Sequence, residues 1–306
     1  MKAVIIRSFG GPDVLEVAEV PVPEPGSGQV RIRVAAAAVN PVDVQTRAGR
    51  LTAGGLLPER EVIGIGWDVA GTVDALGPGV AGFRPGDAVI GLSDRLALPL
   101  KTQAEYVVLD AGAVAAVPAG TDPVAAATLP LGGLTAAQAL DIAGAEPGDT
   151  LLVTGAAGAV GGYTVQLAAL AGLRVVAVAD TGDEELVREL GAEFFVPRTA
   201  DLPAAVRDLV PGGVRAAVDA ASVGVLALDA VRGGGSLVSV LGNGPTPLRG
   251  TRVDNVWVRA DGPRLADLAA AGLRPRIADV LPLDEVAEAH RRLAAGGLRG
   301  RLVLVP

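Results

Sequence analysis

The amino-terminal third of the chain alternates hydrophobic and polar positions in short runs that turn residues separate. Val30–Val34 places valine and isoleucine on one face and arginine on the other, which is the period-two pattern of a half-exposed strand. Clusters of glycine and proline follow at Gly77–Gly79 and Arg84–Asp87. Further strands are predicted at Val69–Leu76, Asp87–Gly91 and Ala104–Leu109. Many short strands between such turns favour an antiparallel β-barrel up to about Pro118.

From about Thr121 onward, helix-length segments alternate with short β-branched runs. The predicted strands are Leu151–Thr154, Arg174–Ala179, Phe194–Val196, Arg215–Asp219, Ser236–Leu241 and Val256–Arg259. Such alternation is typical of a parallel, doubly wound sheet. An amphipathic helix over Pro282–Ala295 and a last strand over Arg301–Val305 are assigned back to the first domain. We therefore predict an α/β protein with a discontinuous barrel domain over residues 1–118 and 264–306, and a doubly wound domain over 119–263.

The most informative local pattern is a glycine-rich turn between a buried strand and a helix. Leu151–Gly161 reads LLVTGAAGAVG, and a helix is predicted over Tyr163–Ala171. A dinucleotide diphosphate needs a tight turn, close approach to the backbone and free N–H groups at a helix start. Alanine stands where the first glycine of GxGxxG usually lies, so the strand–helix context carries the prediction. The expected diphosphate contacts are Ala157, Gly158, Ala159, Val160 and Gly161.

An acidic residue follows the second strand of this segment. Asp180 lies 19 positions after Gly161, close to the ~20 expected for a carboxylate that binds the adenosine ribose. A carboxylate there repels a 2′-phosphate and favours NADH, although Asp180 is equally well explained as a helix cap. Arg198 follows the third strand and is a further candidate contact at the adenosine end. Leu241 and Gly242, at the end of the fifth predicted strand, complete the expected cofactor contacts.

Composition narrows the possible chemistry. The net charge of −8 argues against nucleic acid or an anionic membrane as a partner. The chain has no cysteine and a single histidine, His290, so thiolate metal sites and cysteine nucleophiles are excluded and no metal site is expected. Thr150–Leu173 is uncharged and long enough to span a bilayer, but its glycines fit a strand that turns into a helix. We expect a cytoplasmic protein.

Motifs along essentially the whole chain resemble one family. They are Asn40-Pro41-Val42-Asp43, Gly66-Trp67-Asp68-Val69-Ala70-Gly71, Ala104-Glu105-Tyr106, Ala156–Gly161 and Gly300–Leu304. In these motifs the chain resembles the zinc-independent quinone-oxidoreductase branch of the medium-chain dehydrogenases/reductases. The resemblance implies a GroES-like barrel domain, a Rossmann domain and nicotinamide in the cleft between them. It further implies NADPH, a cofactor contact from Thr135 and a homodimer, which we expect to form through an edge strand around Val256–Val258.

Departures from the zinc-dependent relatives change the expected mechanism. Asn40 and Val42 occupy the positions of a cysteine ligand and a hydroxyl proton relay, and Trp67 replaces a histidine ligand. Gln45 and Leu51 replace two tyrosines of the quinone-reductase pattern. Reduction of an isolated ketone to an alcohol needs a Lewis acid or a positioned proton donor. Hydride addition to a quinone or enone is less demanding, because the charge spreads over the conjugated system.

The predicted function is a metal-independent, NAD(P)H-dependent reduction of a quinone or another α,β-unsaturated carbonyl. Candidate polarising residues are Asn40, Gln45 and Arg47. Asn40 also fits a helix N-cap before Pro41, and Gln45 and Arg47 also fit a solvated helix face. Two other functions stay open, namely an enoyl or ketone reductase for one biosynthetic metabolite and a non-catalytic dinucleotide-binding protein.

Several residues have a structural interpretation beside a functional one. Thr135 either contacts the cofactor or caps its own helix, and Trp67 either forms the floor of the substrate pocket or belongs to the core. His290 lies on one helical stripe with Val286 and Leu293, so it is expected to be packed or capping. Tyr106 and Tyr163 are expected to be structural. The substrate pocket is expected to draw on the loops Leu51–Arg60, Leu92–Leu100 and Leu241–Arg249.

Overall fold

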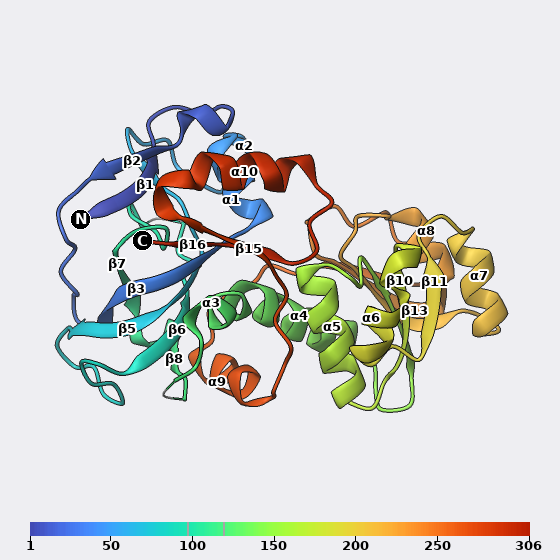
Figure 1. Ribbon diagram of the computed structural model, residues 1–306. Helices are drawn as coiled ribbons and strands as arrows, with labels where there is room; N and C mark the ends of the chain where they lie inside the picture. Colours follow the sequence, from blue (N-terminus) through green and yellow to red (C-terminus); the bar gives the residue numbers. More distant parts are fainter. Residues whose placement is uncertain (97, 119) are drawn as a thin grey trace. The chain divides into compact units, whose positions relative to one another are not determined.

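The computed structural model describes residues 1–96, 98–118 and 120–306 (Figure 1). The chain forms two compact units. The first unit contains Met1–Leu131 and Arg259–Pro306, and the second unit contains Gly132–Val258. Both chain ends therefore lie in the first unit, and the boundaries fall after residues 131 and 258 instead of 118 and 263. Residue 119, where the second domain was predicted to begin, lies outside the described residues.

The first unit is built from two sheets of mainly antiparallel strands. The smaller sheet has the order β2-β1-β4, and the larger has β15-β16-β3-β5-β6-β8 with β7 paired to β3. The predicted strand at Val30–Val34 is the first half of a longer strand, because the buried alanines after it continue the pairing. The strands are β1 (Lys2–Ile6), β2 (Glu16–Glu19), β3 (Gln29–Val39), β4 (Ile63–Gly64), β5 (Asp68–Leu76), β6 (Ala88–Leu92), β7 (Tyr106–Asp110), β8 (Val114–Ala116), β15 (Ile277–Pro282) and β16 (Arg301–Val305).

The expected barrel is confirmed as a GroES-like arrangement of strands, but it does not close into one ring of hydrogen bonds in the described part of the chain. The two sheets meet at a single bridge between Ala3 and Ala104. The pair β15 and β16 is parallel, unlike its neighbours. Apolar clusters pack the described part of this unit. One lies around Val30, Ile32 and Val69 of the larger sheet, and another joins β1, β4 and β16 to α10.

The second unit is a doubly wound parallel sheet, as predicted. Its strand order is β11-β10-β9-β12-β13-β14, and every neighbouring pair is parallel. The strands are β9 (Thr150–Thr154), β10 (Arg174–Ala179), β11 (Phe194–Pro197), β12 (Val214–Asp219), β13 (Val231–Ser239) and β14 (Arg252–Asn255).

Two predicted strands of this sheet are placed differently. The prediction of Val256–Arg259 is wrong, because β14 ends at Asn255 and the chain then leaves the sheet, with Trp257 67% exposed. The fifth strand ends at Ser239 instead of Leu241, and it begins five residues earlier, at Val231. The start of this strand could not be predicted from the sequence, because it contains the glycines at 233–235 and glycine is disfavoured in strands.

Alternating residues of the central strands pack against different helices. Leu151, Val153 and Val175 belong to a cluster that includes α4, α5 and α6. Leu152 and Val176 belong to a second cluster that includes α7 and α8. Because side chains alternate across a strand, helices cover both faces of the sheet. Because the strands are parallel, the carboxyl ends of β9, β10 and β12 lie at one edge of the sheet, where the glycine-rich turn and Asp180 follow β9 and β10.

Helices connect these strands, and four single turns of 3₁₀ helix add to them. Within the described residues, none of the helices is both long and apolar enough to cross a membrane. The helices are α1 (Pro41–Arg47), α2 (Arg50–Ala53), α3 (Pro123–Ala126), α4 (Leu129–Ala143), α5 (Ala159–Leu170), α6 (Glu184–Glu189), α7 (Leu202–Leu209), α8 (Val225–Ala230), α9 (Gly262–Ala270) and α10 (Val286–Ala295), with 3₁₀ turns at Pro12–Val14, Ala111–Ala113, Thr181–Asp183 and Leu283–Glu285.

Candidate active site

The glycine-rich turn between β9 and α5 requires glycine at two positions for different reasons. Gly155 has φ +61°, a conformation that favours glycine. A Cβ on Gly161 would lie 2.1 Å from the carbonyl oxygen of Gly155, so any side chain there would collide with the turn. Gly158 is tight as well, since its Cβ would lie 3.1 Å from the same oxygen. Helix α5 begins at Ala159, four residues earlier than predicted.

The start of α5 offers free backbone donors. Its N-cap is Gly158, which has no side chain to cap the helix, and the first intrahelical donor is the N–H of Gly162, 2.8 Å from the Gly158 oxygen. The N–H groups of Ala159, Val160 and Gly161 therefore have no partner within the helix. Ala157–Val160 are half-buried, so ligand can reach them. A turn made only of glycine and alanine, with free donors at a helix start, fits a dinucleotide diphosphate.

An interaction that the sequence analysis did not identify braces this turn. Asp219, at the end of β12, accepts a hydrogen bond from Thr154 Oγ1 at 2.6 Å and others from the backbone N–H groups of Val223 and Gly224. Because Thr154 directly precedes Gly155, the carboxylate fixes the end of β9. Both residues lie at carboxyl ends of neighbouring parallel strands, and that placement was the available signal.

The two candidate residues for the adenosine end lie together. Arg198 Nη2 and Asp180 Oδ2 are 2.9 Å apart, and their side chains are 69% and 49% exposed. Asp180 precedes a 3₁₀ turn but its side chain makes no capping hydrogen bond, so the capping interpretation is wrong. The pairing means that an arginine already balances the carboxylate that was expected to repel a 2′-phosphate.

The remaining candidates of the second unit are dispersed. Leu241 is exposed and follows β13, and Gly242 beside it has φ +76°. Thr135 is buried in the second turn of α4, six residues after that helix begins, so it does not cap its own helix. All three stay candidate cofactor contacts.

In the first unit, Asn40 and Asp43 frame the start of α1. Asn40 is the N-cap, Pro41 occupies the first helical position, and the Asn40 N–H donates to Asp43 Oδ2 at 2.8 Å. The Asn40 side chain is buried, and its Nδ2 donates to Asp68 Oδ2 at 2.7 Å and to the Ala38 oxygen at 3.4 Å. The Asn40 amide therefore holds Asp68 in place, and the N-cap interpretation accounts for its position.

Two buried carboxylates meet around this residue. Asp43 accepts from the N–H of Gly66 at 3.1 Å and from Gln103 Nε2 at 3.3 Å, and Asp68 accepts from the N–H of Leu131. Burial, with a smaller contribution from the charge of Asp68, raises the pKa of Asp43 to about 7, against the lowering effects of the N–H donors and of Lys101. Burial raises the pKa of Asp68 to about 6, against the lowering effect of Arg301. We refer to Asn40, Asp43, Asp68 and Gln103 as the carboxylate cluster.

Arg47 is not on a solvated helix face, and that alternative is wrong. Its side chain is 5% exposed. Its Nε donates to the Gly10 oxygen at 3.2 Å, and its Nη1 lies 3.3 Å from His290 Nδ1. Burial, together with the Arg47 charge, lowers the pKa of His290 to about 3, so the imidazole is neutral and accepts from arginine. His290 is packed as expected, whereas Gln45 is half-buried on α1.

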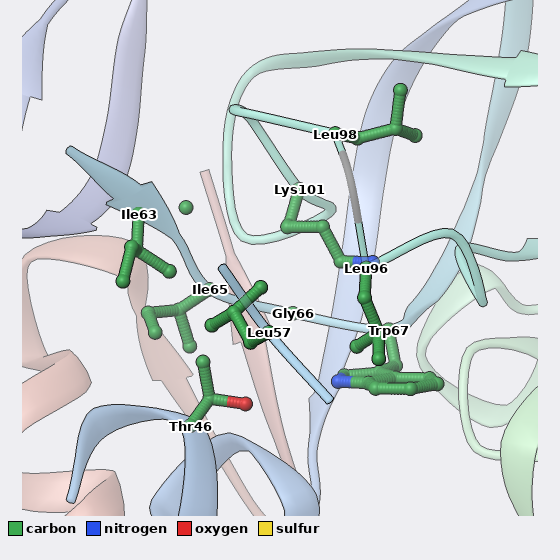
Figure 2. A pocket seen from close by; sticks show the side chains of 10 residues that line it. Thr46, Leu57, Ile63, Ile65, Gly66, Trp67, Leu96, Leu98 and Lys101 are labelled. Carbon is green, nitrogen blue, oxygen red and sulfur yellow. The ribbon is translucent and has the colours of Figure 1, made fainter. Parts of the chain in front are cut away.

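A small pocket of the first unit gathers residues from two of the loops expected to line the substrate site (Figure 2). Leu57 comes from one loop, and Leu96 and Leu98 come from the other, whose residue 97 lies outside the described residues. Trp67 also lines the pocket while being 8% exposed, so it belongs to the core, and its contact with a substrate stays a prediction. Lys101, which the sequence analysis overlooked, completes the wall, with its Nζ 4.8 Å from the centre of the Trp67 ring.

Comparison with known proteins agrees with this architecture. The family model of the alcohol dehydrogenase GroES-like domain matches residues 26–119, and that of zinc-binding dehydrogenases matches residues 159–259. The chain is 34% identical to a 2-methylene-furan-3-one reductase of Solanum lycopersicum, over 100% of this chain and 79% of that protein.

Solved structures are similar over the entire chain. The quinone oxidoreductase of Coxiella burnetii has a TM-score of 0.87 and 30% identity, covering 100% of this chain and 99% of the other. A mycobacterial protein solved in complex with NADPH has a TM-score of 0.84 and 29% identity, with 100% of both chains covered.

Proposed function

The chain belongs to the medium-chain dehydrogenase/reductase superfamily, and from this premise we propose that it transfers hydride from a reduced nicotinamide dinucleotide to a quinone or another α,β-unsaturated carbonyl. The observation that carries the proposal is the turn at Gly155–Gly161, where a Cβ on Gly161 would collide with the backbone and helix donors are free. Similarity to a furanone reductase and to a quinone oxidoreductase supports the substrate class.

The zinc of related dehydrogenases does not fit this chain. There is no cysteine, and the single histidine is buried with its Nδ1 against Arg47. Across residues 1–96, 98–118 and 120–306, no three histidine, cysteine or acidic residues are grouped as metal ligands. Trp67 fills the position of a zinc ligand with an apolar ring. We therefore derive no step through a metal.

The chain's own residues bind and orient the reactants. The N–H groups of Ala159, Val160 and Gly161 donate to the diphosphate, and the half-buried Ala157–Val160 segment forms its contact surface. When bound, the reduced nicotinamide supplies a hydride. Binding and orienting both reactants accounts for up to ~7–11 kcal/mol of a barrier. Asn40 acts by positioning, because its amide holds Asp68.

We propose NADPH as the preferred cofactor. Asp180 alone favours NADH, but Arg198 pairs with it at 2.9 Å and is exposed enough to bind a 2′-phosphate instead. The NADPH complex of a structural relative supports this choice. Comparison of kcat/KM for NADPH and NADH tests it, and a preference for NADH would contradict it.

The test of the function is the oxidation of reduced nicotinamide with a panel of quinones, enones and saturated ketones. We expect turnover with quinones or enones and far less with saturated ketones, because a saturated ketone has no conjugated system over which the developing negative charge can spread. Turnover confined to one enoyl substrate would favour a dedicated biosynthetic reductase. Tight cofactor binding without any turnover would favour the non-catalytic alternative and contradict the proposal.

We further propose a homodimer, now through β14 instead of the residues after it. β14 (Arg252–Asn255) ends the strand order of the second unit, and the exposed Trp257 follows it. A second copy would cover both the strand edge and the indole. Light scattering of the wild type and of Trp257→Glu tests this, and a monomeric wild type at micromolar concentration would contradict it. The cytoplasmic location stays a prediction.

A further inference from the structure

Lysine is almost absent from this chain. Of its 26 lysine and arginine residues only Lys2 and Lys101 are lysines. Lys2 is an exposed residue that pairs with Asp284 at 3.0 Å. Lys101 is 6% exposed and lies within the first unit. The two amines differ in a way that matters chemically, because an ammonium loses its proton readily when buried whereas a guanidinium does not.

Close backbone packing places Lys101. The N–H of Gly64 donates to the Pro99 oxygen at 2.9 Å, and a Cβ on Gly64 would lie 2.8 Å from the Lys101 backbone nitrogen. The N–H of Gln103 donates to the Ile65 oxygen at 3.0 Å. The segment after residue 98 therefore runs directly beside Ile63–Gly66, and the glycine at 64 allows that approach.

The ammonium of Lys101 is bound by neutral groups. Its Nζ donates to the Ser93 oxygen at 2.6 Å and to the Arg95 oxygen at 3.2 Å. Among the described residues, no carboxylate forms an ion pair with it. The Arg95 guanidinium is turned away toward Asp110. Because an ammonium has three N–H donors, one is left over for a ligand.

That ammonium borders a pocket with apolar walls. Figure 2 shows Nζ above the indole of Trp67, with Leu57, Ile65 and Leu96 around the same space. The cavity volume is about 10 Å³, which suits one water molecule or one carbonyl oxygen and not a whole quinone. The pocket therefore has room for a single oxygen atom beside Nζ.

We propose that Lys101 Nζ binds the carbonyl oxygen of the substrate and protonates it as negative charge develops there. This inference rests on the proposed function. As hydride adds to the conjugated carbon, the π electrons of the C=C–C=O system move to the oxygen. One Nζ–H bond then breaks, its proton forms the O–H bond of an enol or hydroquinone, and the neutral amine regains a proton from water.

The electrostatics of Lys101 suit a proton donor. Burial lowers its pKa to about 8, while the charges of Asp43 on α1 and Asp94 after β6 oppose that fall. The amine is therefore mostly protonated at neutral pH, yet it gives up its proton more easily than an exposed lysine. Proton transfer works best when the donor pKa lies near the working pH. Arginine at this position would keep its proton.

Binding of 4-nitrophenol tests the inference without turnover. This phenol mimics a hydroquinone monoanion, titrates near neutrality and shows its ionisation as absorbance. We expect wild type to favour the bound phenolate by about tenfold over water. Lys101→Met should lose that preference, while Lys101→Arg should keep it. Lys2→Met is the matched control and should behave as wild type.

Kinetics with the best quinone or enone separate charge from proton transfer. We expect wild-type kcat to fall above about pH 8, and kcat of Lys101→Arg to be about 100-fold lower with little change in KM. Circular dichroism checks folding, and Lys101→Arg keeps the test available if Lys101→Met does not fold.

The outcomes are distinguishable. If Lys101→Met binds 4-nitrophenolate as wild type does, or if Lys101→Arg keeps the wild-type kcat and pH profile, the inference is overturned and Lys101 only ties together the segment from Ser93 to Arg95. If wild type oxidises no reduced nicotinamide with any acceptor, the proposed function fails, and the phenol titration still reports on Lys101.

Discussion

The turn of the second unit and the carboxylate cluster of the first unit are built in opposite ways. At Gly155–Gly161 the binding groups are backbone N–H groups, and the side chains contribute by being absent. At the carboxylate cluster the groups are side chains from α1, β5 and the segment before β7, buried together. A backbone site depends on local conformation, whereas a side-chain site depends on distant segments and on costly burial of charge.

The cluster should therefore be the more sensitive region to loss of one side chain. Asp68→Leu leaves the Asn40 amide and the Leu131 N–H without their acceptor. We expect the free energy of unfolding to fall by about 4 kcal/mol, as for other broken buried pairs. Urea unfolding measures it.

Asp74→Leu is the matched control, on the same strand. Asp74 lies 2.6 Å from Arg31 in a partly exposed ion pair, so its loss should cost at most about 1 kcal/mol. If the two substitutions lowered the free energy of unfolding equally, the burial of Asp68 and its hydrogen bonds would not explain the loss.

A substitution in the glycine-rich turn should change the affinity for the cofactor. Gly161→Val places carbon atoms against the Gly155 oxygen, which a Cβ would approach to 2.1 Å. We expect NADPH affinity to fall by roughly 100-fold, or about 3 kcal/mol, as the turn shifts to relieve the clash. Fluorescence titration measures it. Gly233→Ala serves as control, because its Cβ would meet nothing closer than 3.5 Å, and unchanged affinity of Gly161→Val would disprove the proposed diphosphate site.

This contrast explains which features the sequence could predict. The strand, the glycine spacing and the helix of the turn are encoded within about a dozen consecutive residues, so the location of the turn could be predicted. The contact between Lys101 and Trp67 depends on segments that are far apart in sequence. The only signal for it in the sequence was that lysine is rare in this chain. Val256–Arg259 was misplaced because β-branched and aromatic residues suit an exposed extended segment as well as a strand, and pairing decides between them.

The cluster also predicts a pH response that the turn lacks. The pKa of Asp43 is about 7 when folded and near the usual 3.8 when unfolded, so between these values the folded chain holds the extra proton. Stability from this group is therefore full below about pH 4 and is lost as pH rises through 7. We expect wild type, relative to Asp43→Asn, to lose about 2 kcal/mol between pH 5 and pH 8.

The pH dependence of stability that His290 contributes has the opposite sign. It is the same in wild type and in Asp43→Asn, so it cancels when the two proteins are compared. Its pKa of about 3 in the folded chain lies below the usual 6.5, so its contribution is lost as pH falls through that range, equally in both proteins. Urea unfolding at several pH values measures the difference, and parallel pH curves for wild type and Asp43→Asn would mean that Asp43 does not titrate near neutrality.

The smallest expected effect on cofactor affinity is at Arg198 and Asp180, where side chains of the second unit are proposed to contact the cofactor. Arg198→Ala removes the partner of Asp180 at 2.9 Å, so the carboxylate is no longer balanced and the 2′-phosphate loses its donor. Both residues are exposed, and screening limits the effect. We expect NADPH affinity to fall about fivefold while NADH affinity stays within about twofold, since NADH carries no 2′-phosphate.

Salt sharpens this last test. The loss caused by Arg198→Ala should shrink as ionic strength rises, because an exposed charge pair is screened within about 8 Å at physiological salt. The effect of Gly161→Val is steric and should not change with salt. Paired titrations of both cofactors at low and high salt therefore separate the side-chain contribution from the backbone contribution within one binding site. An equal loss of NADH and NADPH affinity in Arg198→Ala would place Arg198 outside the phosphate contact.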